Sequence, residues 1–236
     1  MDRRRGGATT IEGVRPVIEA IRAGRRKLHH ITLPADGGTP GLRELAALVR
    51  EHGIPTHPGK GEVVAQAEPY SEESFEELLL GKGPRRLVAL DRITDVGNLG
   101  SIARTAEAAG VTGLVLEHRR APPLGPGALR ASAGALEFLR VGRTPNLVRA
   151  LELARSEGLV VLVAEREGGR PLEALDPELL RGDWVWVFGS EERGVRPRVR
   201  AQASEVVAIP LRGQLASLGV AAAAAYLLLR TASFGA

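Results

Sequence analysis

Apolar residues recur along this chain in two patterns, one typical of amphipathic helices and the other typical of buried strands. In the first part, helical spacing predicts helices over residues 11–24 and 41–53, and short apolar runs predict strands over 28–34 and 61–67. The first helix ends at Gly24 and places four apolar residues on one face: Val14, Val17, Ile18 and Ile21. These segments predict a small α/β unit.

Five continuous apolar runs follow, each of a length typical of a strand. They are RLVALD (86–91), GLVLEH (113–118), LVVLVAE (159–165), WVWVFG (184–189) and EVVAIPL (205–211). Helical patterns lie between and after them, over 98–110, 144–158 and 217–230. Apolar runs without alternation are typical of a parallel sheet that is covered on both faces. The expected fold class is therefore α/β, with ligand sites at the carboxyl ends of the strands.

The chain changes character between these two parts. Residues 71–85 begin with an acidic helical turn and continue into Gly, Lys and Pro, as connections between domains often do. The expected organisation is a basic flexible tail over 1–10, an N-terminal α/β domain over 11–70, a linker over 71–85 and a C-terminal domain over 86–236.

Composition argues against several classes of protein. The chain has no cysteine, and its five histidines show no metal-ligand spacing, so neither a disulfide framework nor a metal cofactor is expected. The longest apolar run, 219–229, is far shorter than the roughly 20 residues that span a bilayer. The charged N-terminus lacks the apolar stretch of a secretory signal. A soluble cytoplasmic protein with no membrane partner is expected.

The basic residues are nearly all arginine, although the net charge is only +4. Arginine pairs bidentately with phosphate and stacks on bases, which suits RNA, but GC-rich coding sequences also enrich arginine, alanine and glycine. Common nucleotide-binding motifs are missing. No GxGxxG follows a strand, and GIPTHPGKG (53–61) has neither the glycine spacing of a phosphate loop nor a Ser or Thr after its lysine.

One candidate site follows the strand that ends at Asp91. A turn through Asp95 and Gly97 leads to Asn98, whose side chain is suited to cap the next helix. Arg104 lies off the apolar face of that helix and leans toward its N-terminus, where the helix dipole favours anions such as phosphate. The alternative interpretation is a capped helix with one solvated arginine.

Two more candidates follow the last two strands. Gly189 and Gly194 flank an acidic turn, and paired glycines permit left-handed turns and close approach of the backbone to a ligand. An ordinary strand-to-loop turn has the same pattern. The final strand ends near Ile209, and residues 211–216 then lead to a helix that Ser217 is suited to cap.

Together these stretches resemble the three motifs of the SpoU/TrmH family of S-adenosylmethionine-dependent RNA ribose 2′-O-methyltransferases. The motif stretches are residues 90–111, 184–197 and 206–230, and the resemblance covers essentially all of 86–236. It implies a SPOUT domain with a parallel sheet and a deep trefoil knot, and a homodimer whose interface suits small residues such as the alanine run 221–225. High helix propensity alone also explains that run. The N-terminal domain more loosely resembles the RNA-binding domain of the subgroup that acts on large-subunit ribosomal RNA.

The resemblance also implies roles for individual residues. Those that match catalytic positions are Asn98, Arg104, Glu191 and Ser217, and those that match the pocket for the methyl donor, S-adenosylmethionine, are Gly189, Ile209, Leu211 and Leu218. The implied reaction is attack of a ribose 2′-oxygen on the donor methyl group, with no metal. Because the pKa of arginine is above about 12, Arg104 suits clamping the target phosphate and stabilising the alkoxide better than removing the proton. Asn98 and Glu191 are expected to orient it, and Ser217 to contribute a hydrogen bond.

One position of the third motif departs from the family pattern, which has Ser-Leu-Asn where this chain has Ser-Leu-Gly, ending at Gly219. Losing a hydrogen bond to a buried polar partner costs roughly 1–3 kcal/mol. Two functions are therefore expected. One is methylation of structured RNA, 23S ribosomal RNA before transfer RNA, and the other is RNA binding by a catalytically impaired family member.

RNA capture is expected to rest on the N-terminal domain and on basic side chains. The candidates are Arg3, Arg4, Arg5, Arg25 and Arg26, although solvated surface arginines have the same pattern. Because only 3% of the residues are aromatic, recognition of backbone and shape is expected rather than base stacking.

Overall fold

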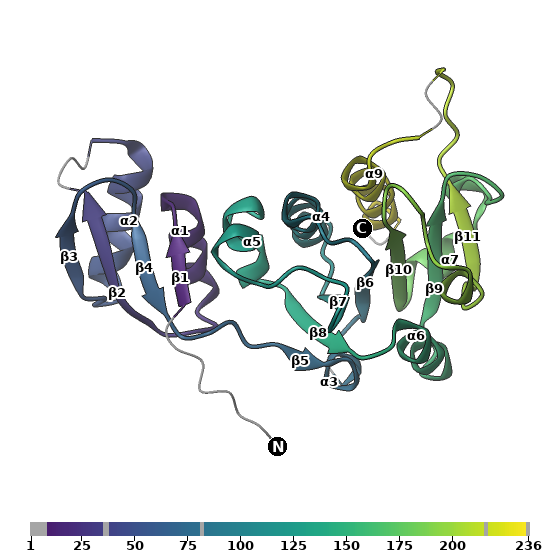
Figure 1. Ribbon diagram of the computed structural model, residues 1–236, viewed down its shortest axis with the longest axis horizontal. Helices are drawn as coiled ribbons and strands as arrows, with labels where there is room; N and C mark the ends of the chain where they lie inside the picture. The colour runs from purple at the N-terminus through teal and green to yellow at the C-terminus, as the bar shows by residue number, and fades with distance from the viewer. Residues whose placement is uncertain (1–8, 35–37, 81–82, 215–216, 235–236) are drawn as a thin grey trace. The chain divides into compact units, whose positions relative to one another are not determined.

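The computed structural model describes residues 9–34, 38–80, 83–214 and 217–234 (Figure 1). The chain divides into two compact units. The first contains residues 1–71 and 123–138, and the second contains residues 72–122 and 139–236.

A four-stranded mixed sheet and the two helices beside it form the N-terminal part of the first unit. The strand order is β1-β4-β2-β3, and the strands are β1 (Thr9–Glu12), β2 (Leu28–Pro34), β3 (Thr56–Gly59) and β4 (Val64–Ala67). The helices α1 (Val14–Ala23) and α2 (Pro40–Glu51) pack against each other. Ile11, expected at the start of the first helix, lies instead in β1, because Gly13 with φ 97° separates the strand from α1.

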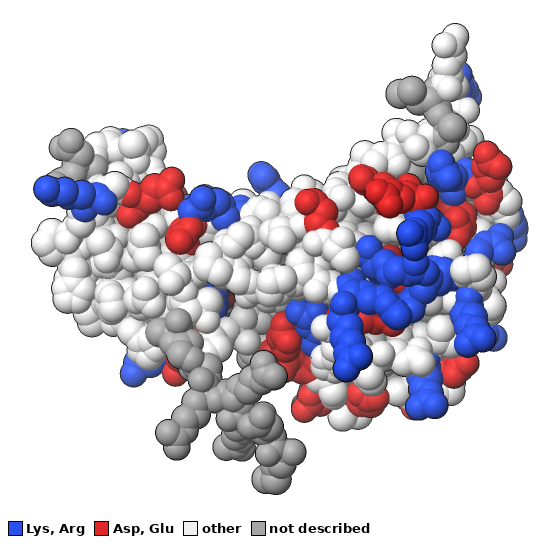
Figure 2. All heavy atoms as spheres, in the orientation of Figure 1, with Lys and Arg blue, Asp and Glu red and all other residues white. Residues whose placement is uncertain are grey.

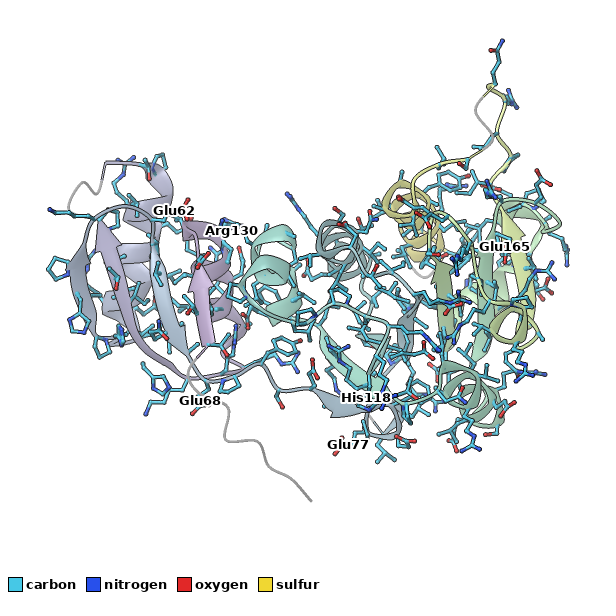
Figure 3. All side chains as sticks on the ribbon, viewed as in Figure 1. Glu62, Glu68, Glu77, His118, Arg130 and Glu165 are labelled. Atoms are coloured by element: carbon cyan, nitrogen blue, oxygen red, sulfur yellow. The ribbon has the colours of Figure 1, made fainter. Side chains whose placement is uncertain are left out.

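Residues 123–138 also belong to the first unit, although the sequence placed them in the C-terminal domain. They form α5 (Pro126–Ala131) and the 3-10 helix η1 (Ala135–Glu137). They pack against β1 and α1, and a buried ion pair adds to this packing, in which Arg26 Nε donates to Glu137 Oε2 at 3.0 Å. On the surface of the unit, Arg130 of α5 pairs with Glu12 and Glu62 (Figure 3).

The second unit is built on a seven-stranded sheet of order β11-β9-β10-β6-β7-β8-β5, in which every pair of neighbours is parallel. Its strands are β5 (Glu73–Ser74), β6 (Arg86–Asp91), β7 (Gly113–Glu117), β8 (Arg140–Thr144), β9 (Val160–Glu165), β10 (Trp184–Gly189) and β11 (Glu205–Ala208). The prediction of a parallel α/β sheet is confirmed. The sequence missed β8 because two of its five residues are arginines, which pair with Glu73 and Glu72 at the sheet edge.

Helices cover both faces of this sheet. They are α3 (Phe75–Leu79), α4 (Val96–Ala108), α6 (Leu147–Ser156), α7 (Pro177–Arg181), α8 (Pro197–Arg200) and α9 (Val220–Ala232), with a 3-10 helix η2 (Leu172–Ala174). Successive side chains of β10 face opposite sides of the sheet. On one side, Val185 and Val187 pack in a cluster with α3 and α6. Trp186 donates from its indole N–H to Thr231 Oγ1 of α9 at 3.1 Å.

The segment expected as a linker, 71–85, is part of the second unit from residue 72 onward. It contains β5 and α3, and Ser74 and Glu77 cap the helix reciprocally. Phe75, Leu78 and Leu79 are buried in the core under the sheet. The acidic residues therefore mark a helix start rather than a flexible connection.

The C-terminal helix α9 is apolar but only 13 residues long. Within the described ranges, no helix has the length and apolar character needed to cross a membrane. The trefoil knot implied by the family resemblance stays a prediction.

Candidate functional site

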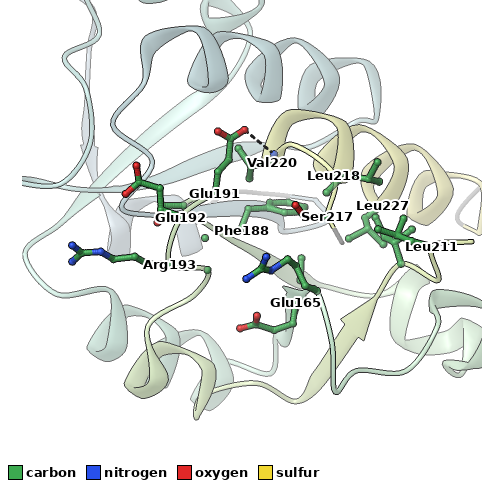
Figure 4. A pocket seen from close by; sticks show the side chains of 17 residues that line it. Glu165, Phe188, Glu191, Glu192, Arg193, Leu211, Ser217, Leu218, Val220 and Leu227 are labelled. Atoms are coloured by element: carbon green, nitrogen blue, oxygen red, sulfur yellow. Dashed lines mark hydrogen bonds between the residues drawn. The ribbon is translucent and has the colours of Figure 1, made fainter. Parts of the chain in front are cut away.

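A cavity lies at the carboxyl ends of β9, β10 and β11 in the second unit (Figure 4). It is lined by the end of β9, by the loop 188–194, by the chain after β11 and by the first turns of α9. The four residues expected to bind the donor all line it: Gly189, Ile209, Leu211 and Leu218. Two of the four expected catalytic residues, Glu191 and Ser217, line it as well.

The loop after β10 folds back on itself at this cavity. Gly194 donates its N–H to the Ser190 carbonyl at 2.8 Å and has a left-handed φ of 60°. A Cβ atom at Gly189 would lie 2.2 Å from the Gly194 carbonyl carbon, which real side chains never tolerate. Gly189 is therefore required for the tight return of the loop.

Three charged side chains meet below this loop in a buried ion-pair network. Arg196 donates its backbone N–H to Asp91 Oδ2 at 2.7 Å and its Nε to Asp91 Oδ1 at 2.6 Å. Arg196 Nη2 lies 2.9 Å from Glu117 Oε2. The Asp91, Glu117 and Arg196 side chains are 0%, 4% and 18% exposed. Because Asp91 ends β6 and Glu117 ends β7, the network fixes the loop to the carboxyl ends of these two strands.

The charges in this network reinforce one another. Burial lowers the pKa of Arg196, but the Glu117 and Asp91 carboxylates outweigh burial and raise the pKa above its ordinary value. Glu117 also accepts a hydrogen bond from Leu147 N at 3.2 Å, at the N-terminus of α6, where a negative charge is favoured. Removing one partner of such a buried pair typically costs about 3–5 kcal/mol, because the other charge is left uncompensated.

The start of α9 differs from the expectation for the third motif. The N-cap is Gly219, with φ −59° and ψ 147°, and not Ser217, which is exposed two residues earlier. Glycine has no side chain to cap the helix, and Glu191 Oε1 instead accepts a hydrogen bond from Val220 N at 3.2 Å (Figure 4). Glu191 was expected to hold an arginine, and in the structure it caps α9.

The start of α4 also differs from the expectation. The N-cap is Asp95, whose Oδ1 accepts a hydrogen bond from Asn98 N at 2.7 Å, so Asn98 is a residue of the first turn and not the cap. Asn98 lines a second cavity together with Glu191 and Val220. Asn98 and Glu191 thus line the same cavity, and their catalytic roles stay a prediction.

Arg104 lies apart from these residues. It is six residues beyond Asn98, about 9 Å further along the helix axis. It is exposed, and it lines neither the cavity at the ends of β9, β10 and β11 nor the second one. No hydrogen bond or ion pair joins its guanidinium to another residue in the described part of the chain. The expected contacts from Asn98 and Glu191 to Arg104 are therefore missing there.

Residues 85–229 match the model of the SpoU rRNA Methylase family. The chain belongs to the SpoU family. An uncharacterized tRNA/rRNA methyltransferase of Mycobacterium avium (strain 104) is 34% identical over 238 residues, which are 93% of this chain and 75% of the relative.

Solved structures share the fold of this SpoU-family protein. The SpoU methyltransferase AviRb from Streptomyces viridochromogenes, in complex with AdoMet, superposes with a TM-score of 0.79 at 26% identity, over 98% of this chain and 93% of that one. The AdoMet-bound rRNA methyltransferase from Sinorhizobium meliloti has a TM-score of 0.73 at 24% identity, over 95% and 86% of the two chains. The protein is an S-adenosylmethionine-dependent RNA methyltransferase, and the predictions of family, fold and enzyme class are confirmed.

Sequence reasoning missed Glu165, an acidic residue of the cavity at the end of β9 (Figure 3). Burial raises the pKa of its carboxyl, and this effect exceeds the opposing influence of Arg200 and Arg166. Arg200 Nε lies 3.8 Å from Glu165 Oε1, beyond hydrogen-bond reach. A carboxylate directly after an apolar strand, at the edge of the sheet where ligands bind, is the signal that could have identified it.

The arginines expected to capture RNA do not all lie on the surface. Arg26, expected to capture RNA, is buried against Glu137, with side chains 5% and 1% exposed. Arg3, Arg4 and Arg5 lie outside the described residues. On the face in Figure 2, basic side chains gather over the second unit. In the described part of the SpoU-family chain, no group of three or more His, Asp or Glu side chains is placed to hold a metal ion.

The crowding around Gly189 allows a test of whether this cavity binds the methyl donor. Gly189→Ala is expected to weaken S-adenosylmethionine binding by more than about tenfold, because the new methyl group must displace the 194–195 backbone. Titration calorimetry measures the affinity, and a thermal melt reports whether the variant is folded. Gly213→Ala is the matched control, since nothing lies within 4 Å of a Cβ atom there. Equal affinities in the two variants would show that the loop return does not shape the donor site.

Proposed function

We propose that this SpoU-family protein transfers a methyl group from S-adenosylmethionine, bound in the cavity between β9, β10, β11 and α9, to a ribose 2′-hydroxyl of 23S ribosomal RNA. The observation that carries the proposal is the convergence of the second and third motifs on one cavity, with Gly189, Ile209, Leu211 and Leu218 all in its wall. The ribosomal substrate is supported by the matched family model and by the separate N-terminal unit.

The cavity has the chemistry that the donor requires. Phe188 and Leu227 supply apolar surface, and the backbone of the glycine loop is open to close approach. Glu165 supplies a half-buried carboxylate for a positively charged molecule. When bound, S-adenosylmethionine supplies a methyl group that its sulfonium has already activated.

The protein's own contribution is to position the RNA and stabilise charge. Arg104, exposed and without a partner in the described chain, is available to hold the phosphate of the target nucleotide and the developing alkoxide. Asp95 and Glu191 cap the two helices that start at the second cavity, and Asn98 adds its side-chain amide there. Ser217 contributes a hydroxyl at the donor cavity. The proton passes to phosphate or water, because the guanidinium stays protonated.

A methylation assay with purified protein tests this assignment. About one S-adenosylmethionine should bind per chain, and 23S ribosomal RNA should acquire a 2′-O-methyl group, detected as resistance to alkaline cleavage at one position.

Arg104→Ala should lower turnover by about 10²–10³-fold, the loss typical of one hydrogen-bond donor to a developing oxyanion, with S-adenosylmethionine binding unchanged. Arg149→Ala, an exposed arginine of α6, is the control. Unchanged turnover in Arg104→Ala would refute the catalytic role of Arg104. Methylation of transfer RNA alone would show that transfer RNA, and not 23S ribosomal RNA, is the substrate.

A second function, RNA binding without methylation, is favoured by one observation, Gly219 in place of the motif asparagine. The structure weakens that alternative because Gly219 is the N-cap of α9, and glycine as N-cap costs only a few tenths of a kcal/mol against asparagine. Glu191 already accepts the hydrogen bond of Val220 N there.

Restoring the asparagine separates the two functions. A Cβ atom at Gly219 would lie 3.2 Å from Glu191 Oε1, so an asparagine there would crowd the Glu191 carboxylate where it accepts the hydrogen bond from Val220 N. Gly219→Asn is therefore expected to leave turnover within about threefold of wild type or to lower it. A large gain in turnover, measured with the same RNA, would support a decayed catalytic site. Gly219→Ala is the control, since it adds the Cβ atom without an amide.

We also propose that the protein is a homodimer formed through α9. Tyr226 and Leu229 are 37% and 50% exposed on this helix, beside its small alanines. Sedimentation is expected to give the mass of two chains, and Leu229→Glu to shift it toward one chain, because a buried unpaired charge is costly at an interface. Leu80→Glu, at a leucine that is 82% exposed directly after α3, should change nothing. A wild-type mass of one chain would refute the dimer.

A further inference from the structure

Arg92 follows β6 in a backbone conformation that side chains rarely adopt. Its φ is 61°, and in the described part of the chain only Arg92 and Ala133 combine a left-handed backbone with a side chain. The conformation is disfavoured for residues other than glycine because the Cβ atom crowds the following carbonyl oxygen. Arg92 comes directly after Asp91, which the Arg196 ion pair fixes. Such strain persists where the surroundings impose it, and it is common at functional sites.

The turn at Arg92 borders the second cavity, which adjoins the donor cavity. Arg92 and Asn98 line the second cavity from one side, and Glu191, Arg193 and Val220 line it from the other. The last three also line the donor cavity, so the two cavities share a wall. In Figure 4, Glu191 and Arg193 extend from the same loop in different directions.

The Arg92 and Arg193 guanidinium groups have no partner among the described residues, by ion pair or by hydrogen bond. Arginines nearby are different. Arg120, Arg196 and Arg200 lie 3.5, 2.6 and 3.8 Å from a carboxylate oxygen. Arg92 and Arg193 thus place two cations at one cavity, and no carboxylate of the described residues forms an ion pair with either of them.

The carboxylates of the second cavity are engaged elsewhere or exposed. Asp95 Oδ1 accepts from Asn98 N, and Glu191 Oε1 accepts from Val220 N, so each faces the N-terminus of a 13-residue helix. Glu192 is exposed and forms no ion pair within the described ranges. These three carboxylates keep their charge, so an anion such as phosphate would bind here through direct contact with the two guanidinium groups and not through a net positive charge of the cavity.

We propose that Arg92 and Arg193 bind a backbone phosphate of the substrate RNA beside the nucleotide that is methylated. This inference rests on the proposed function and adds a second anion contact, separate from Arg104, which lies outside both cavities. The shared wall places this phosphate next to the methyl donor. The left-handed turn is retained because it directs a guanidinium to that place.

Substitutions at Arg92 separate charge from strain. Arg92→Gln removes the charge and keeps the strain, whereas Arg92→Gly removes both. Both variants, and Arg193→Gln, should bind a 23S ribosomal RNA transcript about tenfold more weakly, as expected for one lost charge-assisted hydrogen bond. The slope of log affinity against log salt should fall by about 0.7–0.9. S-adenosylmethionine binding should be unchanged, and Arg92→Gly should unfold at the same or a higher temperature than wild type.

Controls distinguish this inference from the proposed function. Arg149→Gln, on the exposed face of α6, should bind RNA as wild type does, and Arg92→Lys should keep most of the salt dependence. Wild-type affinity and salt slope in both Arg92→Gly and Arg193→Gln, with methylation intact, would overturn the phosphate contact and leave the proposed function standing. If the wild-type protein neither binds nor methylates 23S or transfer RNA, the proposed function itself fails, and this inference with it.

Discussion

The ion pairs of Arg196 decide where the parts of the cavity lie. Asp91 and Glu117 end neighbouring strands, and a carboxylate at each would repel the other if no cation stood between them. Arg196 neutralises both and belongs to the loop that carries the second motif, so folding of the loop and burial of the two acids depend on each other. The strained turn at Arg92 follows from the same anchor, because the preceding residue cannot move.

The start of α9 shows how one substitution can be absorbed. An N-terminal helix turn needs an acceptor for its unpaired N–H groups, and the acceptor can come from the cap itself or from another part of the chain. Here Gly219 leaves that place open, and Glu191 fills it from the β10 loop. The second and third motifs are thereby linked through a hydrogen bond rather than through an asparagine side chain.

The arginines of the second unit divide by their surroundings. Arg196, Arg140 and Arg143 are paired with acids and hold the sheet and its loops in place. Arg92 and Arg193 have no such partner in the described chain. Net charge is therefore a poor guide to RNA binding here, since part of the basic side chains form structural ion pairs with acids.

The sequence by itself determined the α/β class with its parallel sheet and the family, because these follow from local apolar runs and from motifs a few residues long. Tertiary structure decided the rest. The Arg196 network joins residues 105 apart, the cap of α9 comes from Glu191, and residues 123–138 join the first unit through Glu137. Such pairings depend on which strand ends become neighbours, and spacing along the chain carries no record of that.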